Sequence, residues 1–370
     1  MENWRRGLVK EPLEARLFRV GRLVAAARRL ADPADALGRK ARARLPESTG
    51  LSLQGVELAL SQCLELQPTE VELRTLCQSV PRAPRAHVLL SANVFVAAHR
   101  AIALALAAAA HVEVRASTRE PVMAALLHEA DPGLFRLVDE LAPAPGDHVW
   151  LYGEDRTIAK LRDDFSSGVV IHAHGPGIGV AVVQATADAE QVAERQLAAA
   201  AKSLAHDVIP FDQRGCLSPR LALVLGTPAT GKVFAEPLSR ELARLESTVP
   251  RGSLSRDEAA DAAWYRDTVR YCGGLLRAGQ GWVGVDLESD GLLLPPIGRN
   301  VQVVRVTDLQ GVLGPLVPAI AAVGLAGPRE LGERVRELVP RARYSILGSM
   351  QKPRFDGPVD RRPDQRGETL

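Results

Sequence analysis

The chain has 370 residues, of which 46% are hydrophobic, so it can bury a large core and form two or three domains. Lys and Arg number 46 against 44 Asp and Glu, a formal net charge of +2, and no basic block is interleaved with aromatic residues. Because a nucleic-acid partner usually requires a basic face, this balance argues against a nucleic-acid-binding protein.

Residues 1–80 are predicted to form a helix-rich N-terminal segment. Apolar residues recur at helical spacing in Glu14–Leu30 and again in Ser52–Leu66. The first residues, Met1–Arg6, carry charges without the hydrophobic core that a secretory signal needs. We therefore expect no export signal in this segment.

From residue 81 to residue 205, short aliphatic strands are predicted to alternate with helices. The predicted strands are His87–Asn93, His111–Arg115, Asp147–Tyr152 and Gly168–His172. The predicted helices between them are Val96–Ala110, Pro121–Ala130 and Arg156–Phe165. Such alternation predicts a parallel, doubly wound sheet whose ligand binds at the carboxyl ends of the strands.

A second α/β domain is predicted over residues 206–340, after the long amphipathic helix Asp188–Ala205. Its predicted elements are the strand Leu221–Leu225, the helices Gly231–Leu245 and Arg256–Tyr271, and the strands Trp282–Asp286 and Val301–Val306. Residues 341–370 form a C-terminal segment. Asp, Arg and Pro dominate after Pro353, so we expect the end of the chain to be disordered.

Apolar runs and cysteine spacing narrow the class of protein further. The run Ala101–Ala110 is shorter than the roughly 20 residues of a membrane span, and it is predicted to be a buried crossover helix. The chain contains no Cys-x-x-Cys pair among its four cysteines, Cys63, Cys77, Cys216 and Cys272. We therefore expect no zinc site, no disulfide scaffold and a cytoplasmic protein with reduced thiols.

Cys216 is the candidate nucleophile. It lies in Phe211–Arg220, between a polar turn that contains a glycine and the predicted strand Leu221–Leu225. Only a thiolate attacks, and two nearby cations, Arg214 and Arg220, can favour the anion. A cysteine is often simply a small buried hydrophobe. The polar neighbours and the preceding α/β pattern favour a catalytic role here.

Five motifs resemble those of the LuxC-type acyl-CoA reductases, a branch of the aldehyde dehydrogenase superfamily. The Asp-Gln-x-x-Cys-x-Ser-Pro pattern of Asp212–Pro219 is similar to the family's nucleophile motif. The other matches follow in the family's order: Ser91–Asn93, Val114–Pro121, His174–Gly177 and Leu347–Pro353. Together they cover about residues 85 to 355, although each short motif alone is weak.

The resemblance implies an aldehyde-dehydrogenase-like fold, in which a doubly wound cofactor domain is joined to a second α/β domain that carries the nucleophile. It also implies that Asn93 and the backbone N–H of Cys216 stabilise the oxyanion formed when the thiol attacks an acyl group. Each such donor is worth on the order of 3 kcal/mol. An asparagine that ends a strand by binding its own backbone is the alternative for Asn93. Its place before a helix, in the family's order, favours the catalytic role.

The family's adenosine-ribose loop corresponds here to Arg115-Ala-Ser117-Thr118, followed by Arg119. The chain has no G-x-G-x-x-G motif, as the superfamily binds its dinucleotide differently. NAD-preferring relatives place a carboxylate at the position of Thr118. Arg115 and Arg119 can instead bind a 2′-phosphate, so the resemblance predicts NADPH as the cofactor. Two exposed loop arginines without a role are the alternative.

Gly153 is similar to the turn at which the family's next strand meets the cofactor pyrophosphate. Here it is followed by Glu154 and Asp155, where small polar residues are usual. The two acidic residues depart from the family's pattern and weaken this assignment.

The family's hydrolytic relatives carry a glutamate that activates water, and the corresponding stretch here is His172–Gly177. Without that carboxylate, the acyl-enzyme is expected to exchange with a thiol such as CoA or carrier-protein pantetheine. His174 is a possible acid or base, and His172 shares the His-x-His pattern. A structural or merely exposed pair is the more common role for such histidines. No metal is expected, because no third ligand is nearby in the sequence.

Gly226–Lys232 fits the G-x-x-x-x-G-K pattern of phosphate-binding loops. Val233 stands where a hydroxyl should hold Mg²⁺, and Pro228 removes one donating N–H group. A P-loop nucleotide-binding protein is therefore the lower alternative.

The sequence thus predicts NADPH-dependent reduction of a long-chain fatty acyl-CoA or acyl-carrier thioester to the aldehyde, through an acyl-enzyme on Cys216. The thioester is the expected partner, and the family suggests a homo-oligomer. An inactive scaffold or partner subunit with the same fold is the alternative. It is favoured by Glu154 and by the lack of a family carboxylate near Pro295-Pro296.

Overall fold

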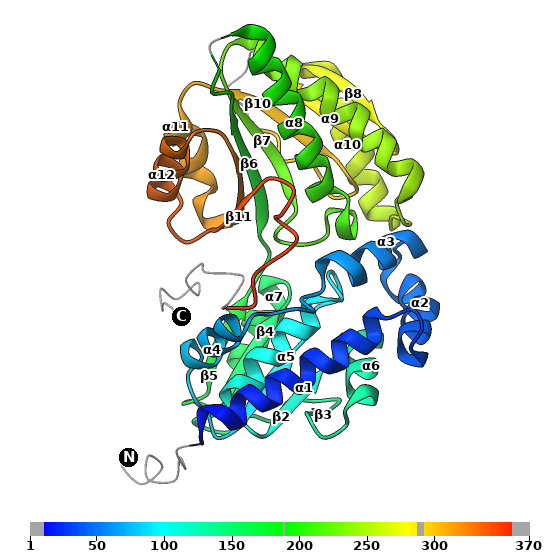
Figure 1. Cartoon of the computed structure of the whole chain (residues 1–370), viewed down its shortest axis with the longest axis vertical. Helices are drawn as coiled ribbons and strands as arrows, with labels where there is room; N and C mark the ends of the chain where they lie inside the picture. Colours follow the sequence, from blue (N-terminus) through cyan, green and yellow to red (C-terminus); the bar gives the residue numbers. More distant parts are fainter. Residues whose placement is uncertain (1–10, 188, 287–291, 357–370) are drawn as a thin grey trace.

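The computed structural model describes residues 11–187, 189–286 and 292–356, which form two halves, each built around one sheet (Figure 1). The first half contains the start of the described chain, from Glu11, and the second contains Cys216. This arrangement confirms the predicted fold class, an α/β protein with a doubly wound parallel sheet and a second α/β unit.

The first half holds a five-stranded parallel sheet in the order β3-β2-β1-β4-β5. Its strands are β1 (Ala86–Leu89), β2 (Val112–Arg115), β3 (Arg136–Leu137), β4 (His148–Tyr152) and β5 (Val170–His174). Its helices are α1 (Leu13–Ala31), α2 (Ala36–Thr49), α3 (Leu53–Leu58), the π-helical turn η2 (Ala59–Cys63), α4 (Glu70–Ser79), α5 (Ala97–Ala108), α6 (Val122–Ala130) and α7 (Asp155–Asp164). The strand order reverses between β1 and β4, which is where ligands bind in such sheets.

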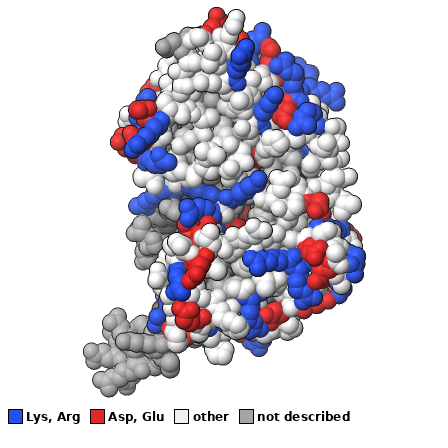
Figure 2. Space-filling model, in the orientation of Figure 1, with Lys and Arg blue, Asp and Glu red and all other residues white. Residues whose placement is uncertain are grey.

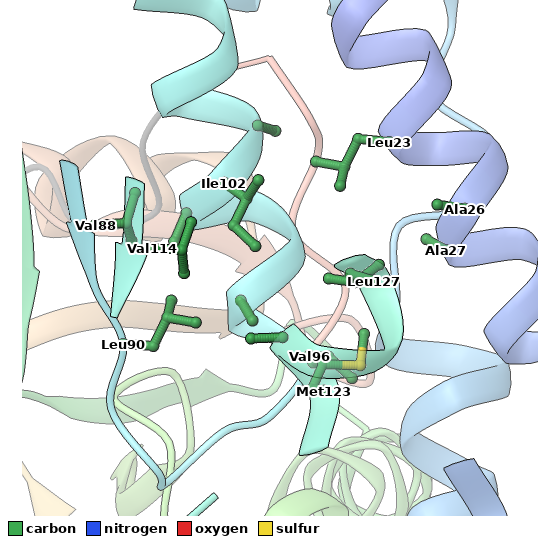
Figure 3. Packing of buried hydrophobic residues seen from close by; sticks show 14 of the residues in the cluster. Leu23, Ala26, Ala27, Val88, Leu90, Val96, Ile102, Val114, Met123 and Leu127 are labelled. Carbon is green, nitrogen blue, oxygen red and sulfur yellow. The ribbon is translucent and has the colours of Figure 1, made fainter. Parts of the chain in front are cut away.

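Helix α5 is enclosed by the rest of the first half, and every residue from Ala98 to Ala108 is buried. Figure 3 shows Ile102 of α5 lying between Val88 and Val114 of the sheet and Leu23 of α1. The small alanine side chains let the sheet and α1 approach α5 closely from opposite sides. Within the described ranges, no helix is both long and apolar enough to cross a membrane.

The second half holds a seven-stranded sheet in the order β12-β11-β6-β7-β10-β9-β8, in which only the β8–β9 pair is antiparallel. Its strands are β6 (Ile178–Gln184), β7 (Pro219–Leu225), β8 (Gly274–Ala278), β9 (Gly281–Asp286), β10 (Val301–Val306), β11 (Ile320–Ala326) and β12 (Arg343–Ile346). Its helices are α8 (Glu190–Val208), the 3₁₀ turn η3 (Pro210–Gln213), α9 (Pro228–Thr248), α10 (Arg256–Cys272), α11 (Leu309–Leu313), the 3₁₀ turn η4 (Gly314–Ala319) and α12 (Arg329–Leu338). Helices α8 and α9 pack on one face of the sheet, and α11 and α12 pack on the other.

Strand β6 was not among the predicted elements, yet it lies inside the second sheet between β7 and β11. The chain therefore passes from the first sheet to the second between His174 and Ile178. That point comes before the predicted division at residues 205 and 206. Helix α8 belongs to the second half, because it packs against β6 and β7.

The C-terminal segment returns from β12 to the first half. The Phe355 side chain is buried, with its ring centroid 5.3 Å from that of His99, and the Arg100 guanidinium lies over the same ring. Packed structure thus continues past Pro353, where disorder was expected to begin. Residues 357–370, the rest of the predicted disordered tail, lie outside the described residues.

Candidate active site

Cys216 lies in a tight turn at the amino end of β7. The Ser218 backbone N–H donates to the Gly215 carbonyl at 3.0 Å, which closes the turn around Cys216 and Leu217. The cysteine is half-buried and packs at the margin of the second core. Part of the residue therefore remains exposed to solvent.

The turn is preceded by three successive non-glycine residues with left-handed backbone. The φ angles of Phe211, Asp212 and Gln213 are 56°, 50° and 65°. Each such residue costs about 1 kcal/mol or more, so surrounding contacts must hold this backbone. The Gln213 side chain does so by donating to the carbonyls of Pro219 and Asn300 at 2.9 Å and accepting the Asn300 N–H at 2.7 Å.

Asp212 is the second anchor of this segment. Its Oδ1 accepts from Nε of Arg299 at 2.9 Å, and Nη2 of the same arginine lies 2.8 Å from that oxygen. Its Oδ2 accepts the Gly252 backbone N–H at 3.0 Å. Arg299 and Asn300, which hold Asp212 and Gln213, were not identified from the sequence. No local signal marks them, since each is 87 residues away from its partner.

The structure brings the Asn93 segment beside the Cys216 turn. Asn93 is exposed and follows β1, at the carboxyl edge of the first sheet. Its neighbour Val94 lies so close to Gly215 that a Cβ there would be 3.0 Å from Val94 Cγ2. Next to it, Phe95 meets Phe211 edge-on, with ring centroids 6.0 Å apart. The predicted oxyanion residue and the predicted nucleophile therefore lie on two segments in direct contact.

The C-terminal Leu-Gly-Ser-Met-Gln motif also meets the Cys216 turn. Asp207, at the end of α8, accepts the backbone N–H groups of Gly348 and Met350 at 2.6 and 2.8 Å. Nε2 of Gln351 lies 3.3 Å from Oγ of Ser218. Burial raises the pKa of the Asp207 carboxyl to about 6, although the two N–H donors oppose that rise.

The predicted cofactor residues gather at the carboxyl edge of the first sheet. Arg115 is the last residue of β2, and Ser117 Oγ accepts the Arg119 N–H at 3.3 Å. Thr118 and Arg119 are exposed. Nη2 of Arg119 donates to Oδ1 of Asn93 at 2.5 Å, so this arginine reaches the predicted oxyanion residue.

Gly153 follows β4, on the other side of the point where the strand order reverses. Its N–H donates to the His174 carbonyl at 3.3 Å, and a Cβ built on it would have no atom within 4 Å. That open space, next to the reversal point and the arginine loop, fits a dinucleotide lying across the ends of β1 and β4. Glu154 and Asp155, which begin α7, place negative charge at the same edge.

His172 and His174 stack on aromatic side chains of β4. Nε2 of His172 lies 3.0 Å from Nδ1 of His148, and its ring stacks on Trp150 with centroids 4.5 Å apart. Burial lowers the pKa of His172 to about 3, so the ring is neutral near pH 7. His174 is buried and stacks on Tyr152 with centroids 4.5 Å apart. Among the residues described, no group of three or more His, Cys, Asp or Glu is placed to hold a metal ion.

The guanidinium groups of Arg214 and Arg220, two residues near Cys216 in the sequence, form hydrogen bonds with other segments of the second half. Nη2 of Arg214 donates to the Ser253 carbonyl at 3.0 Å and to Glu258 at 3.2 Å. Nε of Arg220 donates to the Pro295 carbonyl at 2.6 Å, and burial lowers the pKa of its guanidinium to about 10. Arg214 therefore ties the turn to Ser253 and to the first turn of α10, and Arg220 ties it to the loop at Pro295.

The Gly226–Lys232 stretch is a strand-to-helix turn at the end of β7 opposite Cys216. Thr227 and Thr230 form a capping box at the start of α9. Oγ1 of Thr230 would lie only 2.6 Å from a Cβ on Gly226, so it occupies the space beside that glycine. The backbone here caps a helix with its own side chains.

Residues 136–352 match the sequence model of the family described as acyl-CoA reductase (LuxC). The chain is 27% identical over 169 residues to a long-chain acyl-protein thioester reductase of Aliivibrio fischeri, covering 45% of this chain and 33% of that protein. It is 22% identical over 195 residues to a long-chain acyl-protein thioester reductase 2 of Photobacterium leiognathi, covering 52% of this chain and 39% of that protein. The matched part thus spans between a third and two fifths of the length of these curated relatives.

Solved structures with a similar fold are oxidoreductases. A NAD-dependent benzaldehyde dehydrogenase from Corynebacterium glutamicum superimposes with a TM-score of 0.65 at 13% identity, over 92% of this chain and 81% of that one. An oxidoreductase from Marinobacter aquaeolei superimposes with a TM-score of 0.68 at 13% identity, over 95% of this chain and 84% of that one. At such identities the likeness establishes the fold alone.

Proposed function

This chain belongs to the acyl-CoA reductase (LuxC) family, and on that basis we propose that it reduces a fatty acyl thioester to the aldehyde. We further assign Cys216 as the nucleophile, Asn93 as an oxyanion donor and NADPH as the reductant. The observation that carries the assignment is the contact between the Asn93 segment and the Cys216 turn, through Val94 and Gly215. The curated relatives, named as long-chain acyl-protein thioester reductases, point to a long acyl chain carried on CoA or on a protein.

In the first half-reaction, the Cys216 thiolate attacks the thioester carbonyl carbon and forms a new C–S bond. The carbonyl oxygen becomes an oxyanion, which the Asn93 amide and the Cys216 backbone N–H stabilise by about 3 kcal/mol each. The bond to the original sulfur then breaks. That sulfur leaves as a thiolate and takes up a proton, while the acyl group remains on Cys216.

In the second half-reaction, the acyl carbon on Cys216 would accept a hydride, which is the chemistry that a nicotinamide cofactor would supply when bound. The same two donors hold the oxyanion of the resulting thiohemiacetal. The Cys216 C–S bond then breaks, the aldehyde leaves, and the thiolate is restored. Burial lowers the pKa of His172 to about 3, which makes its imidazole a poor counterpart for the water-activating carboxylate of hydrolytic relatives.

NADPH is favoured over NADH by the charges of the ribose loop. Arg115 and Arg119 flank Thr118, and a 2′-phosphate can bind guanidinium groups in a bidentate manner. The carboxylate that follows in sequence, Glu120, is buried and accepts the Met123 N–H at 3.0 Å, so it is engaged at the start of α6. Because Arg119 already donates to Asn93, Arg115 carries the larger share of this preference.

Lys and Arg side chains on the surface of the molecule can attract the phosphate groups of CoA and of the cofactor. Figure 2 shows a band of Lys and Arg side chains that runs from the left margin of this face toward its middle, at the level where the two halves meet. A positive band beside a site raises the local concentration of anionic ligands.

The second candidate is a protein of the same fold without activity. It is favoured by Glu154 and Asp155, whose negative charges stand at the start of α7, near the site assigned to the pyrophosphate. One assay decides between the two candidates. Purified protein is mixed with long-chain acyl-CoA and NADPH, and loss of the nicotinamide absorbance is followed together with the aldehyde. Activity that disappears in Cys216→Ser supports the reductase, and no aldehyde from any chain length supports the inactive fold.

A further inference from the structure

Two backbone segments near Cys216, residues 211–213 and residues 298–299, contact each other, and both have left-handed backbone. Among the described residues, four that are not glycine have a positive φ angle, and all four lie in these segments: Phe211, Asp212, Gln213 and Arg299. Backbone of this kind persists only where its surroundings hold it, and it concentrates at functional sites. Specific contacts must therefore hold the left-handed backbone of residues 211–213, directly before the proposed nucleophile.

A single buried guanidinium joins the two segments. Arg299 and Asp212 are each 1% exposed, and Oδ1 of Asp212 receives both Nε and Nη2 of Arg299. The Gly298 N–H donates to the Asp212 carbonyl at 3.0 Å, which adds a backbone bond between the segments. Removing Asp212 would leave the Arg299 guanidinium with Glu246 as its carboxylate partner, and removing Arg299 would leave the buried Asp212 carboxylate with Arg214, whose Nη1 lies 3.6 Å from its Oδ2.

The far side of the same guanidinium contacts different elements. Nη1 of Arg299 donates to Glu246 at 2.8 Å and to the Val249 carbonyl at 2.7 Å, both at the end of α9. The other carboxylate oxygen of Glu246 accepts the Arg251 N–H at 2.7 Å. Arg299 thus has a second carboxylate partner on α9, and its contact with the Val249 carbonyl does not depend on Glu246.

We propose that the Asp212–Arg299 ion pair positions the Cys216 turn against Asn93, so that both residues act as positioning residues for acyl transfer. This inference rests on the proposed function in so far as the positioned thiol is the nucleophile. The left-handed backbone sets the orientation of the Cys216 turn relative to Asn93. The ion pair keeps that backbone from relaxing. Without the pair, the segment would relax toward ordinary right-handed backbone and move the thiol relative to the Asn93 amide. A displacement of about 1 Å at such a site can cost on the order of a hundredfold in rate.

The test compares Asp212→Asn with Glu246→Gln, because both variants remove one carboxylate from the same guanidinium. Amide hydrogen exchange of peptides covering residues 209–219 reports on the turn and requires no substrate. Steady-state kinetics and melting temperature are measured in parallel. In Asp212→Asn, we expect exchange in residues 209–219 to accelerate about tenfold or more, with kcat about tenfold lower and the NADPH KM nearly unchanged. In Glu246→Gln, exchange in this segment and kcat should stay within about threefold of the parent, even if stability falls by a similar amount.

Arg299→Lys provides the second variant if Asp212→Asn does not fold. It keeps the charge but cannot bind Asp212 through two nitrogens while also reaching Glu246. We expect it to accelerate the same exchange and lower kcat. Equal effects of Glu246→Gln and Asp212→Asn, or unchanged exchange in residues 209–219 when Asp212 is altered, would overturn the positioning role. An inactive parent protein would instead overturn the proposed function, while the exchange comparison would still decide the role of the ion pair.

Discussion

Arg119 donates to Oδ1 of Asn93 at 2.5 Å, so a residue assigned to the cofactor is in contact with a residue assigned to the oxyanion. Because the Asn93 amide oxygen accepts from Arg119, the orientation of the amide group is fixed. The amide nitrogen can then donate to another group, such as an oxyanion. The two arginines of the ribose loop are therefore not equivalent. Arg115 lies at the end of β2, and Arg119 reaches across to the segment that follows β1.

Replacement of each arginine by alanine separates these roles. Arg115→Ala should raise the KM for NADPH much more than that for NADH, with little change in kcat, because only NADPH offers a 2′-phosphate. Arg119→Ala should lower kcat as well, since it releases the Asn93 amide. Initial rates with both cofactors measure this. Equal effects of Arg115→Ala on the two cofactors would show that Arg115 does not bind the 2′-phosphate.

Introducing a carboxylate into the same loop tests the cofactor preference from the opposite direction. Thr118→Glu should shift the ratio of kcat/KM values toward NADH, because the new carboxylate repels the 2′-phosphate and can accept the ribose 2′-hydroxyl. Thr118→Gln is the matched control, since it has a similar size and no charge. A shift of equal size in the glutamine variant would attribute the change to shape rather than to charge.

Asn93→Ala should lower kcat by about a hundredfold while changing the substrate KM little, as expected for a donor that acts mainly on the oxyanion. Asn93→Asp is a sharper variant, because it nearly preserves the shape but replaces the donor with a negative charge. Its kcat should be at least as low. Full activity in both variants would assign Asn93 to the end of β1 as a structural residue.

The parts of the fold that could be predicted were those with a local pattern. Alternating aliphatic strands and helices predicted β1, β2, β4 and β5, and the polar turn around Cys216 marked the candidate nucleophile. Strand β6 was missed because Ile178–Gln184 follows directly on the Gly-Pro-Gly turn of Gly175–Gly177, without an intervening helix.

The contacts that build the site depend on tertiary structure. Asp212 and Arg299 are 87 residues apart, and Asp207 lies 143 residues before Met350, whose N–H it accepts. No spacing rule connects such pairs. The likeness to a known family placed Asn93 and Cys216 in order along the chain, but only the folded structure places Val94 against Gly215.

Asp207 predicts a pH dependence of stability with a definite sign. Its pKa is raised from 3.8 to about 6 in the folded protein, so it contributes stability that is fully present below pH 3.8 and is lost as the pH rises through about 6. The loss is on the order of 3 kcal/mol. We therefore expect the free energy of unfolding of the parent minus that of Asp207→Asn to fall between pH 4 and pH 6.5. Urea unfolding at several pH values measures it, and a difference that stays constant or rises would contradict the assignment.

The central claim is that Cys216 carries the acyl group and that water does not remove it. The most direct test is intact-mass analysis after incubation with long-chain acyl-CoA and no NADPH. We predict a single acyl adduct that maps to Cys216, is absent in Cys216→Ser, persists in Cys272→Ser, and is discharged faster by added CoA than by water. Rapid release of free fatty acid, at a rate that rivals turnover with NADPH, would contradict the absence of a water-activating base. No adduct at any chain length would contradict the assignment of Cys216 as the nucleophile.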